Sequence, residues 1–224
     1  EIIIVDSFSK DNTVIKIKEY NHVKVFSRKF TNFSEQRNFA LSKASNDWVL
    51  FIDADERITP NLKNEIIDVI NIENNKIVAY EVYREFYYKN KLVRFSGCQT
   101  DKVFRLYKTK NISYKKDLMV HEQIAVKGET SNLKYKMKHY SFDSYDEYKN
   151  KMTHYAELRA QELFIKKLKP NSYHYYIKPV YRFINHYVIR LGILDGKKGF
   201  IISYLNAYYV KQRYNELDKL YKKK

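Results

Sequence analysis

The sequence has little cysteine, glycine or proline, and it has no long apolar run. Cys98 is the single cysteine, so no disulfide forms within the chain, in keeping with a reducing compartment. Five glycines and three prolines in 224 residues exclude a linker or a low-complexity protein. No apolar stretch reaches the roughly 20 residues of a membrane-spanning helix, and no secretory signal is recognisable.

Acidic residues are also in the minority, at 26 against 42 lysines and arginines, which gives a net charge of +16. A field of this strength attracts polyanions such as nucleic acid, anionic lipid headgroups or phosphorylated substrates. Lysine that serves only solubility is the alternative interpretation. With 44% hydrophobic and 16% aromatic residues, the chain has enough apolar material for one sizeable core with an appendage.

The first 70 residues alternate between short apolar runs and segments with helical spacing. This alternation is typical of an α/β fold with a sheet that is mixed but mainly parallel and flanked by helices. We expect strands at 2–5, 23–26 and 48–52, and helices that begin near Asn12, at Ser34 as N-cap, and at Thr59-Pro60.

The pattern changes in the rest of the chain. Residues 79–88 alternate apolar and polar side chains, and 103–107 form another short strand, so the sheet becomes mixed. From Ser144, which forms a capping box with Glu147, the spacing is helical. We therefore expect an α/β domain at 1–142 and a helical, basic and aromatic region at 143–224.

Two carboxylates follow the third expected strand, in Asp53-Ala54-Asp55. In an extended segment residues two apart point the same way, and ligands bind at the carboxyl ends of open α/β sheets. Two such carboxylates favour a divalent cation bound together with a diphosphate. A solvated turn that caps the next helix is the alternative, and the triplet alone does not decide between them.

A second group of polar side chains follows the first expected strand. Asp6 ends this strand, and Ser9, Asp11 and Thr13 come soon after it. If the strands are parallel, these side chains lie at the same sheet edge as Asp53, where an acidic residue can hydrogen-bond a base or ribose. Helix capping by Asp11 or Thr13 explains part of the same pattern.

Several longer segments together resemble one family. EIIIVDSFSKDNT at 1–13, EQRNFALSKASNDWVLFIDADERI at 35–58 and VHE at 120–122 resemble glycosyltransferase family 2, and in particular the bacterial β-glucosyltransferases of the lipopolysaccharide inner core. VFRLYK at 103–108, HYSF at 139–142 and RLGILDGKKGF at 190–200 agree with it. The resemblance covers nearly the whole chain and implies a GT-A fold, an inverting reaction, and a further strand before Glu1.

The resemblance also implies roles for individual residues. The donor nucleotide is assigned to Asp6, Ser9, Gln36, Arg37, Asn38 and Asp53, and the metal, Mn²⁺ or Mg²⁺, to the DXD residues Asp53 and Asp55. Glu122 matches the catalytic base, which takes the acceptor proton. His121 orients Glu122 or contacts the acceptor, His139 is either a third metal ligand or a packed histidine, and Arg105 approaches a phosphate or the acceptor.

The C-terminal region combines aromatic, branched aliphatic and basic residues. An amphipathic helix with basic flanks can lie in a lipid headgroup layer, whereas a single stripe such as Ile177, Val180, Tyr181, Ile184, Val188 and Leu191 more often packs on its own protein. For the region as a whole we expect peripheral contact with an anionic membrane surface, in the cytoplasm at the inner face of the cytoplasmic membrane.

The expected function is transfer of a hexose, glucose by the resemblance, from a UDP-sugar to a lipid-linked or lipopolysaccharide-core glycan in cell-envelope synthesis. A polyprenyl-phosphate glycosyltransferase shares the nucleotide half of this site. A basic nucleic-acid-binding module would explain the charge, but helix-turn-helix, zinc-ligand and ribonucleoprotein signatures are absent from the sequence. A scaffold without activity is disfavoured by the retained Asp53, Asp55 and Glu122, and we expect no nucleic-acid partner.

Overall fold

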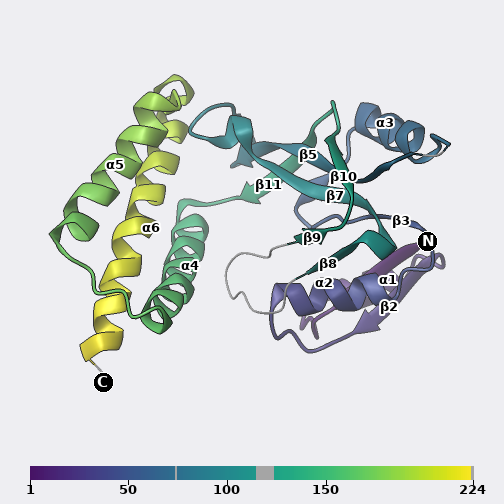
Figure 1. Ribbon diagram of the computed structural model, residues 1–224, viewed down its shortest axis with the longest axis horizontal. Coiled ribbons are helices and arrows are strands. Elements are labelled where there is room, and N and C mark those ends of the chain that lie inside the picture. The colour runs from purple at the N-terminus through teal and green to yellow at the C-terminus, as the bar shows by residue number, and fades with distance from the viewer. Residues whose placement is uncertain (74, 115–123, 223–224) are drawn as a thin grey trace. The chain divides into compact units, whose positions relative to one another are not determined.

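The computed structural model describes residues 1–73, 75–114 and 124–222 (Figure 1). The chain forms two compact units, and we describe each by itself. The first comprises residues 1–51, 72–80 and 104–131, and the second comprises 52–71, 81–103 and 132–224. The long strands β5 (Ile77–Tyr88) and β7 (Lys102–Lys108) contribute residues to both.

The first unit begins with the strand that the apolar run predicts. β1 (Ile2–Asp6) pairs in parallel with β2 (Val23–Ser27), and Asp6 lies opposite Ser27. Helix α1 (Thr13–Lys18) follows β1, and α2 (Phe33–Ser42) follows β2. The N-cap of α2 is Asn32, whose side chain accepts a hydrogen bond from the Glu35 backbone N–H. Our expectation that Ser34 caps this helix was wrong by two residues.

The third strand differs from its expected direction. β3 (Trp48–Leu50) pairs antiparallel with β7, and β1 pairs with β2 in a separate sheet. A short apolar run indicates burial but not strand direction. In this unit β8 (Ile112–Tyr114) also pairs antiparallel with β9 (Ile124–Val126). The core gathers Leu41, Ala79, Tyr107, Ile112 and Tyr114.

The second unit contains the segment that follows β3. β4 (Glu56–Arg57) leads to α3 (Pro60–Ile70), which Thr59 caps by accepting from the Leu62 N–H at 3.3 Å. β11 (Met137–Phe142) lies between β5 and β4, parallel to the first and antiparallel to the second. β6 (Lys91–Val93) forms a hairpin with β5, and β10 (Glu129–Asn132) precedes β11 in the sequence.

The C-terminal part of the second unit is helical. α4 (Tyr145–Ile165) begins at the predicted cap, where Ser144 Oγ accepts from the Glu147 N–H at 3.0 Å. Two π-helical turns, η3 (Tyr173–Ile177) and η4 (Asn185–Ile189), flank α5 (Lys178–Ile184). α4 and α5 both pack on α6 (Lys197–Lys222), as Figure 1 shows. The 3₁₀ turns are η1 (Cys98–Thr100), η2 (Thr109–Asn111) and η5 (Gly192–Asp195).

Aromatic packing joins β11 to the helices of this unit. Phe142, at the end of β11, stacks on Tyr148 of α4 with ring centroids 3.9 Å apart. Ile202 and Leu205 of α6 are buried in the same cluster. The arrangement confirms an α/β protein with mixed sheets and a C-terminal helical region. None of the described helices has the length and apolarity required to cross a bilayer.

A close backbone contact explains why a glycine occurs at position 199, within the segment 190–200. A Cβ on Gly199 would lie 1.8 Å from the carbonyl oxygen of Gly192, so only glycine allows α6 to start against η5. The Asp195 carboxylate accepts from the backbone N–H groups of Arg94 and Phe95, at 3.1 and 2.7 Å. This segment therefore anchors the start of α6 to the loop after β6.

Candidate functional site

A tight turn presents the two aspartates of the second unit. The Glu56 backbone N–H donates to the Asp53 carbonyl at 2.9 Å, and Glu56 Oε2 accepts from the Asp53 N–H at 3.0 Å. The segment is therefore a β-turn closed from both sides, and not the extended strand end from which we expected Asp53 and Asp55 to point the same way. The turn leaves Asp53 and Asp55 half-buried.

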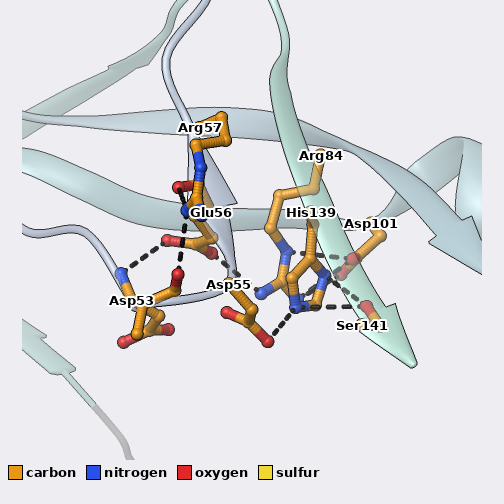
Figure 2. Close-up of polar contacts among 9 residues, drawn as sticks. Asp53, Asp55, Glu56, Arg57, Arg84, Asp101, His139 and Ser141 are labelled. Atoms are coloured by element: carbon orange, nitrogen blue, oxygen red, sulfur yellow. Dashed lines mark hydrogen bonds and ion pairs between the residues drawn. The ribbon is translucent and has the colours of Figure 1, made fainter. Parts of the chain in front are cut away.

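Asp55 lies against the last strand of this unit. Its carbonyl accepts from the Tyr140 backbone N–H at 2.8 Å, and its Oδ2 lies 3.3 Å from Nε2 of His139 (Figure 2). Burial raises the pKa of the Asp55 carboxyl, but the hydrogen bond with the His139 ring, together with the electrostatic interactions with His139 and Lys151, outweighs this effect. The pKa therefore lies below its usual value, and Asp55 is ionised at neutral pH.

His139 is held from a second side by its neighbour on the same face of β11. Ser141 Oγ lies 2.9 Å from Nδ1 of the His139 ring. The ring of Phe86 meets His139 edge-on, with centroids 6.0 Å apart. The imidazole orientation is thus set by a hydroxyl, a carboxylate and an aromatic ring, and both aspartate and histidine belong to one preorganised group.

A buried ion-pair network supports the turn. Arg84 of β5 pairs with Glu56 at 3.3 Å and forms a bidentate pair with Asp101, at 3.0 and 3.1 Å (Figure 2). The Glu56 side chain is fully buried. Because Glu56 also holds the Asp53 N–H, the guanidinium acts on the turn through Glu56. Arg84 is therefore a positioning residue for Asp53 and Asp55.

The Asp55–His139 pair has the chemistry of part of a metal site. Among the described residues there is no group of three or more His, Cys, Asp or Glu side chains that could hold a metal. Metals at phosphoryl-containing substrates are commonly held by one or two protein carboxylates, while phosphate oxygens and water complete the shell. A carboxylate beside an imidazole fits the protein's share of such a site, and the metal itself stays a prediction.

In the first unit, Asp6 organises a loop rather than standing open at the strand end. Its buried carboxylate accepts from the Phe8 N–H at 2.9 Å and from both the N–H and hydroxyl of Ser9. The Ser9 hydroxyl is the largest of the effects that lower the pKa of Asp6. Gln36 Nε2 donates to Ser7 Oγ at 3.0 Å and ties α2 to the same loop.

The next two residues of α2 contact the strand β8. Asn38 pairs with the Tyr114 backbone through two hydrogen bonds, at 2.8 and 3.0 Å. The Arg37 guanidinium lies over the rings of Phe51 and Tyr114, with centroid distances of 5.0 and 5.7 Å. The structure therefore brings Gln36 to the Asp6 loop, and it brings Arg37 and Asn38 to the end of β8.

The remaining predicted site residues are Arg105, His121 and Glu122. Arg105, on β7 in the first unit, is only 2% exposed, so a phosphate would reach it only through a buried position. His121 and Glu122 lie outside the described residues. The catalytic base thus stays a prediction from the VHE segment.

Sequence reasoning missed the supporting residues of the aspartate turn. Glu56 was part of the quoted segment but received no role, and Arg84, Asp101 and Ser141 received none. One signal was available for Arg84, which is the single basic residue in the sequence 77–88. A charged side chain in such a strand requires a partner, but the sequence does not identify Glu56 and Asp101 as that partner.

Residues 1–152 match the family described as Glycosyl transferase family 2. An uncharacterized glycosyltransferase of Rickettsia bellii is 28% identical over 217 residues, covering 93% of this chain and 74% of the relative. The lipopolysaccharide core biosynthesis glycosyltransferase LpsC of Rhizobium meliloti is 25% identical over 226 residues, covering 96% of this chain and 83% of the relative.

Among solved structures, S. aureus TarS 1–349 in complex with UDP is 15% identical, with 100% of this chain and 82% of that chain covered and a TM-score of 0.42. The family match ends within α4 and includes the α/β region. It spans well over half of the sequence, so this chain belongs to glycosyltransferase family 2.

Proposed function

We propose that the protein is an inverting, metal-dependent glycosyltransferase that moves a hexose, glucose by preference, from a UDP-sugar to a lipid-linked or lipopolysaccharide-core glycan. Family membership supports glycosyl transfer. The LpsC relative, named as a lipopolysaccharide core biosynthesis glycosyltransferase, supports the acceptor class. The observation that carries the proposal is the Asp55–His139 pair, held at 3.3 Å on a turn that Glu56 and Arg84 brace.

The reaction breaks one bond and forms one. The acceptor oxygen attacks the anomeric carbon from the face opposite the diphosphate, the carbon–diphosphate bond breaks, and UDP leaves with the bonding electron pair. Glu122 takes the acceptor proton as general base. Asp55 and His139 would hold the cation, which would offset the negative charge of the diphosphate.

The remaining residues bind and orient the donor. The Asp6 carboxylate fixes the loop at residues 7–9, and Gln36 reaches the same loop through Ser7. We assign this loop to the nucleotide, with Arg37 and Asn38 ordering the end of β8 beside it. Asp53 is assigned to the ribose and diphosphate. Arg105 is assigned a phosphate or the acceptor, and His121 the orientation of Glu122.

A donor screen tests the proposal. The full chain is incubated with single nucleotide sugars, Mn²⁺ or Mg²⁺ and an extract of bacterial envelope glycolipid, and release of nucleoside diphosphate is measured. We expect release from UDP-glucose that requires metal and acceptor and is lost in Asp55→Ala. The exposed Asp68→Asn on α3 serves as the matched control and keeps full activity.

Two results would contradict the proposal. One is metal-independent release that persists in Asp55→Ala, and the other is no release with any nucleotide sugar although the chain is folded. Mass analysis of the product identifies the acceptor, because a sugar on a glycan and a sugar on a polyprenyl phosphate differ in the mass and acid stability of the product.

A further inference from the structure

The helix that includes α5 has its apolar stripe on the outside. Ile177, Val180, Tyr181, Ile184 and Val188, which we call the outer stripe, recur at the three- and four-residue spacing of one helix face. Their exposed fractions lie between 44% and 60%. For a single helix, we expected such a stripe to pack on the rest of the protein. The structure shows that this stripe is exposed instead.

The face of the same helix that contacts α6 holds a polar and basic line, beside the buried Pro179 and the Tyr175 ring that packs on Tyr214. It carries His174, Lys178, Arg182 and His186 at four-residue intervals. Lys178 Nζ donates to the Tyr214 hydroxyl at 3.2 Å, and Arg182 Nη2 donates to Asn206 Oδ1 at 3.4 Å. His186 is buried, with Nδ1 2.6 Å from the Ser96 carbonyl oxygen. The helix thus buries its basic line and exposes its apolar stripe.

Helices of water-soluble domains show the opposite arrangement, with the apolar stripe toward the core and charge toward water. The reversal has a free-energy cost, because desolvation lowers the pKa of both Arg182 and His186. A fold that bears this cost and leaves five large apolar side chains exposed is suited to an apolar medium on the outer side.

More exposed apolar side chains continue the outer stripe beyond its C-terminal end. The segment after η4 adds Leu191, Ile193 and Leu194, each 46% to 63% exposed. Phe200 and Tyr204, at the start of α6, are also about half exposed, and Phe200 packs edge-on against Phe183 of α5. The exposed apolar area therefore extends over two successive helices and the turn between them.

The charged residues in this span of the sequence are almost all basic. Between residues 163 and 215 the only acidic side chain is Asp195, and it accepts the Arg94 and Phe95 N–H groups. The same span holds ten lysines and arginines. Those before the outer stripe are Lys166, Lys167 and Lys169, those after it are Arg190, Lys197, Lys198, Lys211 and Arg213, and Lys178 and Arg182 lie on the inward line.

We propose that the outer stripe and its basic flanks dock the protein on an anionic phospholipid bilayer. Exposed aliphatic and tyrosine side chains enter the boundary between headgroups and acyl chains, while the flanking Lys166, Lys169 and Lys197, all exposed, remain at the phosphate level. A protein or nucleic-acid partner fits less well, because nucleic acid offers no apolar layer, and most protein surfaces are not uniformly anionic.

The proposal deepens the proposed function and rests on it in one respect. A lipid-linked acceptor is anchored in a bilayer, so an enzyme that acts on such an acceptor must bind at the bilayer surface. Docking itself does not depend on sugar transfer. A binding experiment with Asp55→Ala therefore separates the two, because that variant is expected to lose transfer and to keep its affinity for vesicles.

Vesicle sedimentation tests the surface. The full chain is mixed with vesicles of equal parts phosphatidylglycerol and phosphatidylcholine, and with vesicles of phosphatidylcholine alone. We expect binding to the anionic vesicles, weak binding to the neutral ones, and weakening at about 0.5 M salt, where surface charges are screened. The triple variant Ile177→Gln, Val180→Gln, Tyr181→Gln should bind at least about tenfold more weakly.

Matched controls distinguish binding through this surface from nonspecific hydrophobic or electrostatic binding elsewhere on the chain. Ile15 and Tyr20 are equally exposed in the first unit, and their change to glutamine should leave binding within about twofold. Replacing Lys166, Lys169 and Lys197 by glutamine should weaken binding by roughly a hundredfold. The same change at the exposed Lys16, Lys18 and Lys63 should weaken it far less. Circular dichroism verifies that every variant is folded.

Three outcomes would overturn the proposal. One is equal vesicle binding by the wild type and the triple glutamine variant. A second is a stable dimer in solution that the triple variant dissociates, because a second copy would then cover the stripe. A third is salt-sensitive binding to RNA that depends on the outer stripe, with no binding to anionic vesicles.

Discussion

Nη1 of Arg84 lies 3.3 Å from Oε1 of the fully buried Glu56, and the other oxygen of the same carboxylate accepts from the Asp53 backbone N–H. The Arg84 guanidinium thus neutralises the Glu56 carboxylate, which holds the turn at Asp53–Asp55 closed. The candidate site in this unit consequently depends on a residue from β5 that acts on the aspartate turn through Glu56.

Replacing Arg84 with methionine should destabilise the protein by about 3–5 kcal/mol, because the buried Glu56 carboxylate loses the guanidinium that pairs with it. The measurement is urea unfolding followed by circular dichroism, with the exposed Arg94→Met as control. The double change Arg84→Met, Glu56→Leu should regain much of this stability but not sugar transfer, since the turn stays unbraced. A loss below about 1 kcal/mol in the single variant would show that Glu56 does not need Arg84.

His186 should make the protein sensitive to mild acid. Burial, helped by the positive charge of Arg182, lowers the pKa of His186 to about 4, against about 6.5 in the unfolded chain. Between these values the unfolded state binds the extra proton, so stability is full above pH 6.5 and falls as the pH drops toward 4. The loss should be on the order of 2–3 kcal/mol.

Unfolding free energies measured from pH 7 to pH 4 check this expectation. His186→Gln should remove the contribution of His186 to the decrease of unfolding free energy with falling pH. The control His154→Gln, at an exposed position, should leave this pH dependence unchanged. If His186→Gln retained the full wild-type slope, the acid sensitivity would have to come from other groups.

The start of α2 offers a test of local structure. Asn32 accepts from the Glu35 N–H at 2.9 Å, so Asn32→Ala should cost about 1 kcal/mol of unfolding free energy. Asn32→Ser should retain most of the stability, since a hydroxyl oxygen caps equally well. Thermal unfolding measures both. Equal stability of Asn32→Ala and the wild type would mean that the cap contributes nothing in solution.

Glu122 is predicted to act in chemistry and not in donor binding. Glu122→Gln should lower kcat by about 10²–10⁴-fold, because the amide cannot accept the acceptor proton. Affinity for the donor, measured by calorimetry, should stay within about threefold. Unchanged kcat would require another base, and a collapse of donor affinity would assign Glu122 to binding.

The elements were largely predictable, but their pairing was not. β1, β2, α4 and the alternating strand β5 follow from local patterns, since apolar runs, period-two alternation and a capping box each act over a few residues. The antiparallel partner of β3 is β7, more than 50 residues away, and nothing within 48–52 encodes it. Direction therefore had to come from the structure.

The candidate site divides in the same way. Asp55 was predicted as a metal ligand and His139 as either a metal ligand or a packed histidine, and the structure brings the two together across β4 and β11. The turn at Asp53, the bracing of Glu56 by Arg84 and the loop closed by Asp6 depend on long-range or backbone hydrogen bonds, which side-chain spacing does not reveal. The outer stripe was correctly found as periodic, but periodicity alone gave no information on which side it faces.

The most direct test is the coupling between Mn²⁺ and UDP in binding. Calorimetry with UDP, with and without Mn²⁺, should show that the metal strengthens UDP binding by at least about tenfold in the wild type, within the usual range of coupling energies. Asp55→Ala and His139→Ala should abolish this gain, and Asp68→Asn should retain it. The same metal-dependent gain in Asp55→Ala and His139→Ala would contradict the assignment of the pair to the donor's cation.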